Sequence, residues 1–568
     1  MKTKTQTKHV EWWHYALAFL GILFVAFEIY GPALKGEFIF DDVYLPFMMP
    51  GVADGPLRGW LGVRPLLMIT YWFNYQSSGL DPYPYHAVNV LLHAINSVLI
   101  YFVVRKFLAF VSEIPWKRET LAIFSGIVFL LHPVQTEAVA YVVGRSETLS
   151  VMFFLAALAA FLYRRSEDVG WGRAIVVLIL FGLACTVKEH TTVLPGLLIL
   201  IDLYFKTPFR LDGVRRNWRL YVPIVFGGML GVVAVFRVLS TADSAGFAIK
   251  DFTWYQYLYT QFRSFWLYIR LYLLPIGQNG DYGWTASQNI FDQNAWLGLL
   301  GILVAAGAAW HYRRTFPLAS FGFFGLLLLL APTSSVVPIR DVAVERRLYL
   351  PFVCLLLISV DFLRRWKTSR STLTISLAAI STIAAIACFQ RAQVWSNALS
   401  FWSDTARKSP DNSRAQFQLA YAQYVAGQCN AALANYEKTA KLTPPDDRLL
   451  VDWAHALDCV GKTQEALVKL HEALAKTPTA HIYALIGMVH GKRNEVIKSL
   501  QALNTAEKLD PNFDMLYVYR GHVYLNQGQV EPAMSEYQRA LNINPRNQAA
   551  QNSMQVALAR QQVDADRR

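Results

Sequence analysis

Residues 15–31, YALAFLGILFVAFEIYG, form a long apolar run near the start of the chain. A helix rises about 1.5 Å per residue, so a run of this length approaches the roughly 30 Å of a bilayer's hydrocarbon core. The basic segment MKTKTQTKHVEWWH precedes the run, and no cleavage site of small residues is evident. We therefore interpret residues 15–31 as a retained signal anchor that spans a membrane.

Similar apolar runs recur through the first 390 residues and predict an all-α, polytopic membrane domain. The 568 residues are 54% apolar and only 16% charged, whereas soluble domains carry about 25% charged residues. A wholly soluble or disordered protein is therefore excluded. Counted together with residues 15–31, these apolar runs predict about eleven membrane crossings. The other ten lie near 86–104, 121–135, 148–163, 173–187, 191–205, 220–240, 295–311, 316–332, 348–363 and 371–389.

The charge pattern predicts the orientation of these crossings. The net charge is +13, and most of the basic surplus precedes residue 396. Basic residues recur in alternate loops, which is typical of loops that face the cytoplasm rather than of nucleic-acid binding. We therefore expect no nucleic-acid partner. With the N-terminus inside and an odd number of crossings, everything after residue 390 is predicted to lie outside.

The C-terminal part of the chain is a repeat array. Its prolines are separated by 34, 34, 33 and 34 residues, at Pro410, Pro444, Pro478, Pro511 and Pro545. Twelve positions before each proline stands a small residue, and eight positions before stands a large apolar one. This pattern is typical of tetratricopeptide repeats. Residues that tolerate a left-handed turn separate the helices of each predicted pair, at Gly427, Gly461, Asn494 and Gly528.

The pattern divides the chain into a transmembrane domain at 1–392 and a repeat domain at 393–568. The repeat domain is expected to contain a half-repeat and four repeats near 413–446, 447–479, 480–512 and 514–547. Such a solenoid buries its core between neighbouring repeats and offers a concave face to extended peptides. Cys429 and Cys459 lie in this domain and would pair only in an oxidising compartment, which the sequence leaves open.

The candidate chemistry lies in the predicted outer loops. Asp41 and Asp42 follow directly after the first crossing. Two adjacent carboxylates near lipid share a proton readily, because desolvation raises the pKa of a carboxyl group, and either one is a candidate general base. A solvated loop start is the simpler interpretation. The pair is also a candidate ligand set for a divalent cation, but the sequence shows no further ligands.

Other polar residues gather near the same predicted membrane face. His86, Asn89 and His93 share one face of a helix, where polar side chains usually line a cavity or meet a partner. Basic and acidic residues of the outer loops have the composition needed to hold a lipid phosphate while a hydroxyl is activated. We expect them to contact such a phosphate: Arg64, His132, Glu137, Arg145, Lys188, Glu189, Arg346 and Arg347.

Several of these segments resemble one known family. They are Phe40–Asp42, Arg64–Leu66, Tyr85–His93, His132–Val139 and Glu345–Pro351. In this order, and followed by a repeat domain, they resemble the transmembrane and tetratricopeptide-repeat proteins, which are related to protein O-mannosyltransferases of the GT-C glycosyltransferase class. The resemblance covers nearly the whole chain. This chain has Asp41-Asp42 at the position where protein O-mannosyltransferases usually have Asp-Glu.

The resemblance implies a GT-C-like membrane glycosyltransferase. It would transfer mannose or a similar sugar from a polyprenyl-phosphate donor to an acceptor hydroxyl, with Asp41 as the base and the repeat domain holding an acceptor polypeptide. The polar residues named above, including His86, Asn89 and His93, would contact the phosphate and sugar of this donor. The compact size and sparse loops suggest a bacterial inner membrane and a periplasmic repeat domain; a eukaryotic protein would have it in the lumen of the endoplasmic reticulum. Two alternatives are a non-catalytic scaffold for envelope proteins and a transporter of lipid-linked sugars.

Overall fold

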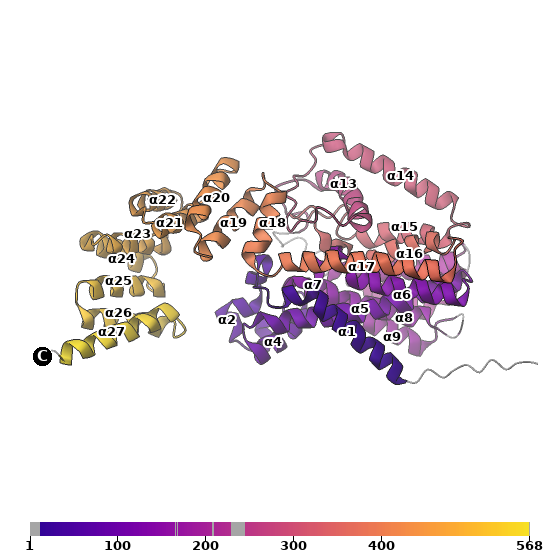
Figure 1. The fold of residues 1–568 in the computed structure, drawn as a ribbon, viewed down its shortest axis with the longest axis horizontal. Helices are drawn as coiled ribbons and strands as arrows, with labels where there is room; N and C mark the ends of the chain where they lie inside the picture. Colours follow the sequence, from indigo (N-terminus) through magenta and orange to yellow (C-terminus); the bar gives the residue numbers. More distant parts are fainter. Residues whose placement is uncertain (1–11, 165, 167, 207–208, 229–244, 567–568) are drawn as a thin grey trace, which may run out of the picture. The chain divides into compact units, whose positions relative to one another are not determined.

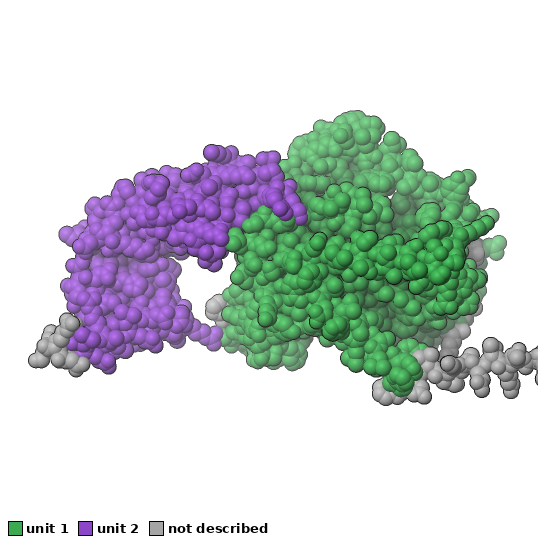
Figure 2. Space-filling model, in the orientation of Figure 1, with its two compact units in different colours: residues 1–404 green, residues 405–568 purple. Residues whose placement is uncertain are grey.

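The computed structural model describes the chain except for residues 1–11, 165, 167, 207–208, 229–244 and 567–568. The described residues form helices joined by loops and contain no β-strand; their one β-type contact is an isolated bridge between Ala245 and Ile339. The chain divides into two compact units, residues 1–404 and 405–568 (Figure 2). The all-α prediction is confirmed for the part of the chain that is described.

Unit 1 contains helices within the predicted crossings, together with two helices, at Pro65–Ser78 and Trp254–Leu273, that no predicted crossing covers (Figure 1). The principal ones are α1 (Trp12–Leu34), α4 (Pro65–Ser78), α5 (Pro82–Phe110), α6 (Pro115–Leu131), α8 (Arg145–Leu162), α9 (Trp171–Val187), α10 (Leu194–Ile201), α13 (Trp254–Leu273), α14 (Ala295–His311), α15 (Pro317–Leu330), α16 (Phe352–Leu363) and α17 (Arg370–Val394). The short helix α7 (Thr136–Ala140) follows a break after α6.

The number of long apolar helices is smaller than the sequence predicts. Five described helices are long and apolar enough to cross a membrane, at Trp13–Leu34, Pro82–Phe110, Val142–Leu162, Asp292–His311 and Arg370–Val394. A sixth is counted if Pro115–Leu131 and Pro133–Ala140, bent by 48° at their break, form one span. Helices α9, α15 and α16 are apolar but shorter.

The difference from about eleven crossings has a physical reason. Hydropathy reports where apolar residues lie but not where a helix ends. Within the predicted crossing 191–205, for example, α10 has only 8 residues and a five-residue π-helical turn follows it. Eight residues extend about 12 Å, well short of the hydrocarbon core. The predicted crossing 220–240 lies in part outside the described residues.

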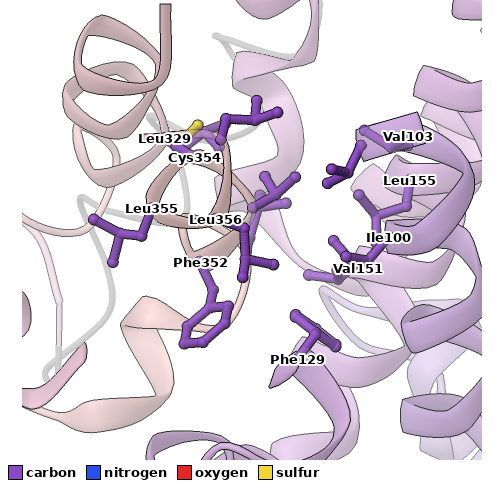
Figure 3. Packing of buried hydrophobic residues seen from close by; sticks show 14 of the residues in the cluster. Ile100, Val103, Phe129, Val151, Leu155, Leu329, Phe352, Cys354, Leu355 and Leu356 are labelled. Carbon is purple, nitrogen blue, oxygen red and sulfur yellow. The ribbon is translucent and has the colours of Figure 1, made fainter. Parts of the chain in front are cut away.

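The core of unit 1 lies where helices from both ends of its sequence meet (Figure 3). Helices α5, α6, α8, α15 and α16 supply its buried apolar side chains, among them Ile100, Val103, Phe129, Val151, Leu155, Leu329, Phe352, Leu355 and Leu356. In lipid the hydrophobic effect does not pull helices together, so close packing must do so. A Cβ added at Gly126 would stand 3.0 Å from the Ser97 carbonyl oxygen, and the absence of that side chain lets α6 approach α5 closely.

Unit 2 is an array of antiparallel helix pairs. The pairs are α19 (Ser413–Val425) with α20 (Cys429–Leu442), α21 (Asp447–Cys459) with α22 (Thr463–Lys476), α23 (Ala480–Lys492) with α24 (Val496–Leu509), and α25 (Asp514–Asn526) with α26 (Val530–Ile543); α27 (Gln548–Asp566) follows. The division between the units falls within α18 (Ala398–Lys408), which links the membrane helices to the first pair.

The turns inside these pairs have the predicted backbone. Gly427, Gly461, Asn494 and Gly528 all have positive φ, between 60° and 80°. That left-handed conformation costs glycine little and asparagine less than most residues. A Cβ at Gly487 would stand only 2.6 Å from the Leu503 side chain, so the small residue of α23 makes room for the large one of α24. The expectation of left-handed turns is confirmed.

Cys429 and Cys459 form a disulfide in unit 2. It joins the first residue of α20 to the last residue of α21, with Cα atoms 6.2 Å apart. The bond therefore ties one helix pair to the next. The sequence left this pairing open, because it did not settle whether the repeat domain lies in an oxidising compartment.

Removing this bond is expected to destabilise unit 2. Replacing Cys429 and Cys459 together with serine should lower the free energy of unfolding of the repeat array by about 3–4 kcal/mol, since the unfolded chain regains the freedom of a closed loop. Thermal unfolding of the full-length protein, followed by circular dichroism, measures the change. Dithiothreitol should lower the melting temperature of the natural protein and leave that of the double variant unchanged. Equal melting temperatures without reductant would contradict the prediction.

Candidate active site

The two adjacent aspartates lie on a short 3-10 helix, η1 (Phe40–Tyr44), in the connection that follows α1. Asp42 is fully buried, and its two carboxylate oxygens accept hydrogen bonds from the backbone N–H groups of Val143, at 2.8 Å, and Ile39, at 3.3 Å. The backbone N–H of Asp41 donates to the Tyr141 hydroxyl at 2.7 Å. These bonds fasten the aspartate loop to the segment that precedes α8.

Asp41 and Asp42 have different environments although they are neighbours. Asp41 is half-buried, and its carboxylate has no hydrogen bond or ion pair with any residue that the structure describes. Burial raises the pKa of Asp42 to about 8, even though its backbone hydrogen bonds act in the opposite direction. Asp42 is thus mostly protonated at neutral pH and holds the loop, whereas the Asp41 side chain has no such fixed partner.

The raised pKa of Asp42 predicts how stability depends on pH. The folded protein keeps this proton up to about pH 8, whereas the unfolded chain loses it near its ordinary pKa of 3.8. Between these values the folded state binds more protons, so stability falls as pH rises. Asp42→Asn removes the titrating group. The variant is expected to gain stability relative to the natural protein by about 1.4 kcal/mol per pH unit within this window.

Melting temperatures of both proteins, recorded from pH 5 to pH 9, measure this difference. The two curves should separate progressively up to about pH 8 and then run parallel. Parallel curves throughout the range would show that Asp42 titrates normally and is not held in the protonated form by burial.

An ion pair lies beside the aspartate loop. The Arg346 guanidinium donates to Glu137 Oε1 at 2.5 Å, and the Arg346 backbone N–H donates to Glu137 Oε2 at 3.0 Å. The guanidinium also lies 5.9 Å from the centre of the Tyr141 ring. Asp41 is within electrostatic range, because its negative charge helps to raise the pKa of Arg346. The structure therefore brings Asp41, Glu137 and Arg346 together.

A second charged group includes the predicted residues Arg64, Lys188 and Glu189. Arg64 donates two hydrogen bonds to the Glu189 carboxylate, at 3.0 and 2.9 Å. Lys188 donates to Glu147 at 2.5 Å. Burial lowers the pKa of Lys188, and the positive charges of Arg64 and Arg346 act in the same direction. The two charged groups are thus near one another. Each of the three cations Arg64, Lys188 and Arg346 already has a carboxylate partner.

Asn89 and Arg145 connect helices. Arg145 is fully buried, and all three of its guanidinium nitrogens donate to protein oxygens. Its acceptors are Asn89 Oδ1 at 3.1 Å, Asn74 Oδ1 at 2.6 Å, and the carbonyls of Thr70 at 3.3 Å and Tyr85 at 2.9 Å. Asn89 donates in turn to the Tyr141 carbonyl at 2.9 Å. In this geometry both side chains position the loop beneath Asp41.

The three predicted histidines also bond to the protein. His86 Nε2 forms a hydrogen bond with the Gly36 carbonyl at 3.1 Å, and His132 Nε2 forms one with the Tyr272 carbonyl at 3.0 Å. His93 joins the Tyr349 hydroxyl at 2.8 Å and the Leu130 carbonyl at 3.1 Å. All three rings are buried. The shared helical face therefore packs against other elements, and these contacts support a positioning role rather than direct contact with a substrate.

Arg346 and Arg347 are neighbours with different surroundings. The Arg347 guanidinium donates to the backbone carbonyls of Val342 and Asp341 within its own loop. It thereby closes the loop that presents Arg346 to Glu137. Of the two arginines that the sequence suggests as phosphate ligands, Arg346 is the one beside Asp41.

Sequence reasoning missed a polar group next to Tyr141. The Trp395 ring lies 5.7 Å from the Tyr141 ring, and its indole N–H has no partner among the described residues. Both side-chain amide atoms of buried Gln135 and the Nε of buried Arg391 also lack a hydrogen-bond partner among the described residues. Buried polar groups are normally hydrogen-bonded, so water or a polar ligand is expected at each of these atoms. Gln135 belongs to the quoted segment His132–Val139, whereas the end of α17 carried no signal beyond its hydropathy.

The aspartate pair does not have the surroundings of a metal site. No group of three or more His, Cys, Asp or Glu side chains among the described residues could hold a metal ion. Both Asp42 oxygens already accept backbone N–H groups. The donor set around Asp41 therefore does not fit a divalent cation, and no step of the chemistry is assigned to one.

The chain is similar to several named proteins. It is 33% identical to human protein O-mannosyl-transferase TMTC1 over 159 residues, which is 25% of this chain and 17% of that protein. It is 34% identical to mouse protein O-mannosyl-transferase TMTC3 over 143 residues, 25% of this chain and 15% of that protein. A longer match, to protein O-mannosyl-transferase F38B6.6 of Caenorhabditis elegans, is 24% identical over 438 residues, 73% of this chain and 61% of that protein.

The repeat part is also recognised. The family model of the tetratricopeptide repeat matches residues 516–547. Among solved structures, TTC0263 of Thermus thermophilus, a thermophilic tetratricopeptide-repeat protein, is 21% identical with a TM-score of 0.27, covering 31% of this chain and 94% of that chain. YrrB, a protein of the same repeat class, is 16% identical with a TM-score of 0.24, covering 32% and 89%.

These relatives test the resemblance that the sequence motifs indicate. The chain spans less than a fifth of the length of TMTC1 and TMTC3, and about three fifths of the worm protein. The resemblance is confirmed: the homologues of this chain are protein O-mannosyl-transferases of the TMTC family, and a tetratricopeptide repeat follows its membrane helices.

Proposed function

We propose that this protein is a GT-C-like membrane glycosyltransferase. It transfers mannose or a similar sugar from a polyprenyl-phosphate donor to a hydroxyl of an acceptor, which is a serine or threonine of a polypeptide. The names of the homologues support the class of reaction. The polar site at the ends of apolar helices supports a donor that is part lipid and part sugar phosphate.

The observation that carries this proposal is the contrast between Asp41 and Asp42. One carboxyl is buried and holds the loop, whereas the other is partly exposed, free of partners among the described residues and within electrostatic range of Arg346. A general base needs an accessible carboxylate that is held in place by its backbone. Asp41 meets both conditions, because the Tyr141 hydroxyl fixes its backbone and leaves its side chain available.

The proposed mechanism is an inverting displacement. Asp41 takes the proton of the acceptor hydroxyl, and the oxygen attacks the anomeric carbon on the side opposite the phosphate. The bond from carbon to phosphate oxygen breaks, and its electron pair leaves with the polyprenyl phosphate. Arg346 and Lys188 stabilise the negative charge that develops there. Arg64 and Glu189 hold the position of Lys188, while Glu137 and Glu147 orient the two cations.

The repeat domain, residues 393–568, is proposed to hold the acceptor. A concave repeat face binds extended peptides, and holding one there would raise its local concentration. We further propose that the transmembrane domain, residues 1–392, places this array outside the cytoplasm. The disulfide between Cys429 and Cys459 supports an oxidising compartment. That compartment is the periplasm for a protein of a bacterial inner membrane, or the lumen of the endoplasmic reticulum for a eukaryotic one.

A transfer assay tests the function. The purified protein is incubated with radiolabelled polyprenyl-phosphate mannose and a peptide rich in serine and threonine, and the label on the peptide is counted. Transfer with an inverted anomeric centre is expected. If the label crosses proteoliposome membranes without reaching any acceptor, the protein is a transporter. If the donor is neither consumed nor moved, the scaffold alternative replaces the proposal.

A further inference from the structure

A groove of about 560 Å³ lies between α1 and α17. Both helices are among those in the described part of the chain that are long and apolar enough to cross a membrane. Glu28, Phe389 and Gln390 are exposed, so in a membrane the groove would open towards lipid. Four polar side chains line it beside apolar ones such as Ile29 and Phe389: Glu28, Thr382, Gln390 and Gln393. None of the residues discussed for sugar transfer contributes to this lining.

Glu28 is the unusual member of this lining. Its side chain is exposed on an apolar helix, and it has no hydrogen bond or ion pair with any residue within the described ranges. An isolated carboxylate in a bilayer is costly, so charged residues in spanning helices usually meet a partner. No Lys, Arg or His lines the groove. A bound molecule with a positively charged N–H donor would balance the Glu28 carboxylate and supply the hydrogen bonds that it lacks among the described residues.

The lining changes from polar to apolar along the groove. Gln390 and Gln393 lie in the last turns of α17, and Glu28 lies near the corresponding end of α1. Further into α17, the Thr382 hydroxyl already donates to the Ala378 carbonyl at 3.0 Å, so that part of the groove offers little but apolar contact. This order matches a lipid, with its headgroup at the ends of the helices and its chains beside their apolar middle.

We propose that the groove binds a phospholipid with a primary ammonium headgroup. Its N–H groups donate to the Glu28 carboxylate, and its phosphate oxygens accept from the side-chain amides of Gln390 and Gln393. An anionic lipid would be repelled by Glu28, and a choline headgroup has no N–H to donate. The same repulsion excludes a sugar phosphate, so this groove is separate from the proposed donor site. The inference does not depend on the transferase activity.

Native mass spectrometry of the full-length protein in detergent tests the proposal. Dioleoyl phosphatidylethanolamine, phosphatidylcholine and phosphatidylglycerol are titrated separately, and the bound fraction of each is counted. The natural protein should bind phosphatidylethanolamine about tenfold more tightly than the other two lipids. This ratio is the contribution expected from one hydrogen bond to a charged group. Glu28→Gln, which has nearly the same shape, should abolish this preference. Replacing Gln390 and Gln393 with alanine should weaken the binding several-fold.

Thr374→Ala is the matched control, because this residue lies on the exposed surface of α17 and is not part of the groove lining. It should leave all three affinities unchanged. Equal binding of the three lipids by the natural protein would overturn the proposal, as would an undiminished preference in Glu28→Gln. A dimer of the natural protein that Glu28→Gln converts to a monomer would also overturn it, because a second chain would then fill the groove. Unchanged melting temperatures show that the variants are folded.

Discussion

Asp41→Asn is expected to reduce sugar transfer by about 10²–10⁴-fold, the usual contribution of a general base. The asparagine side chain has almost the same shape but does not accept the proton of the acceptor hydroxyl. Asp41 is half-buried and its carboxylate makes no hydrogen bond or ion pair with any described residue, so the melting temperature should not change. The radioactive transfer assay and thermal unfolding of the same preparation measure the two effects.

Asp54→Asn is a suitable control for Asp41→Asn. Asp54 is exposed in the same connection between α1 and α5, and its contact with the Tyr75 hydroxyl, at 3.4 Å, is long. It should retain full activity. If Asp41→Asn were active and Asp42→Asn inactive, the base would be Asp42 instead. Full activity in both variants would reject a catalytic role for the pair.

Arg145→Met is expected to destabilise unit 1 by about 3–5 kcal/mol, because several buried acceptor oxygens lose their donor and each such unsatisfied group costs about 1–3 kcal/mol. The substitution removes a fully buried charge together with its hydrogen bonds and leaves the acceptor oxygens of Asn74, Asn89 and Tyr85 without that donor. Arg145→Lys should recover only part of the loss, because an ammonium group does not reproduce the planar fork of the guanidinium.

The melting temperature of detergent-solubilised protein measures this loss. Arg340→Met is the comparison, since Arg340 is 57% exposed and pairs with Asp251 at 3.4 Å on the surface. Such exposed pairs contribute less than about 1 kcal/mol. A change at Arg145 no larger than the change at Arg340 would show that the buried network does not hold α4, α5 and α8 together.

The elements with strong local patterns could be predicted from the sequence. Apolar runs placed the helices of unit 1, and the spacing of prolines and small residues placed the helix pairs of unit 2. Local composition predicts the ends of helices less well than their centres. This explains why the predicted crossings outnumber the long apolar helices among the described residues. The break at His132-Pro133 bends α6 away from α7 by 48° within one predicted run.

The candidate site could be predicted only in part, because a local pattern shows which residue types are present but not which side chains they contact. Polar residues in the loops between apolar runs indicated the candidate site, but residue type does not show which side chain has an unpaired carboxylate and which is buried. Asp41 and Asp42 are identical in type, and only burial separates the carboxyl that holds the loop from the one that is presented. Arg346 and Arg347 likewise differ only in their acceptors, Glu137 and two backbone carbonyls.

The sequence by itself therefore determined the architecture of this protein: apolar helices followed by tetratricopeptide repeats, with clusters of polar residues at the ends of helices. These properties follow from periodicity, which acts over neighbouring residues. The tertiary structure alone decided the roles of Arg145 and the histidines as internal links, the pairing of Cys429 with Cys459, and the exposed position of Glu28. Those properties depend on contacts between residues that are far apart in the chain. At such contacts, the loss of hydration and the hydrogen bonds that replace it determine how much free energy it costs to bury a charged side chain.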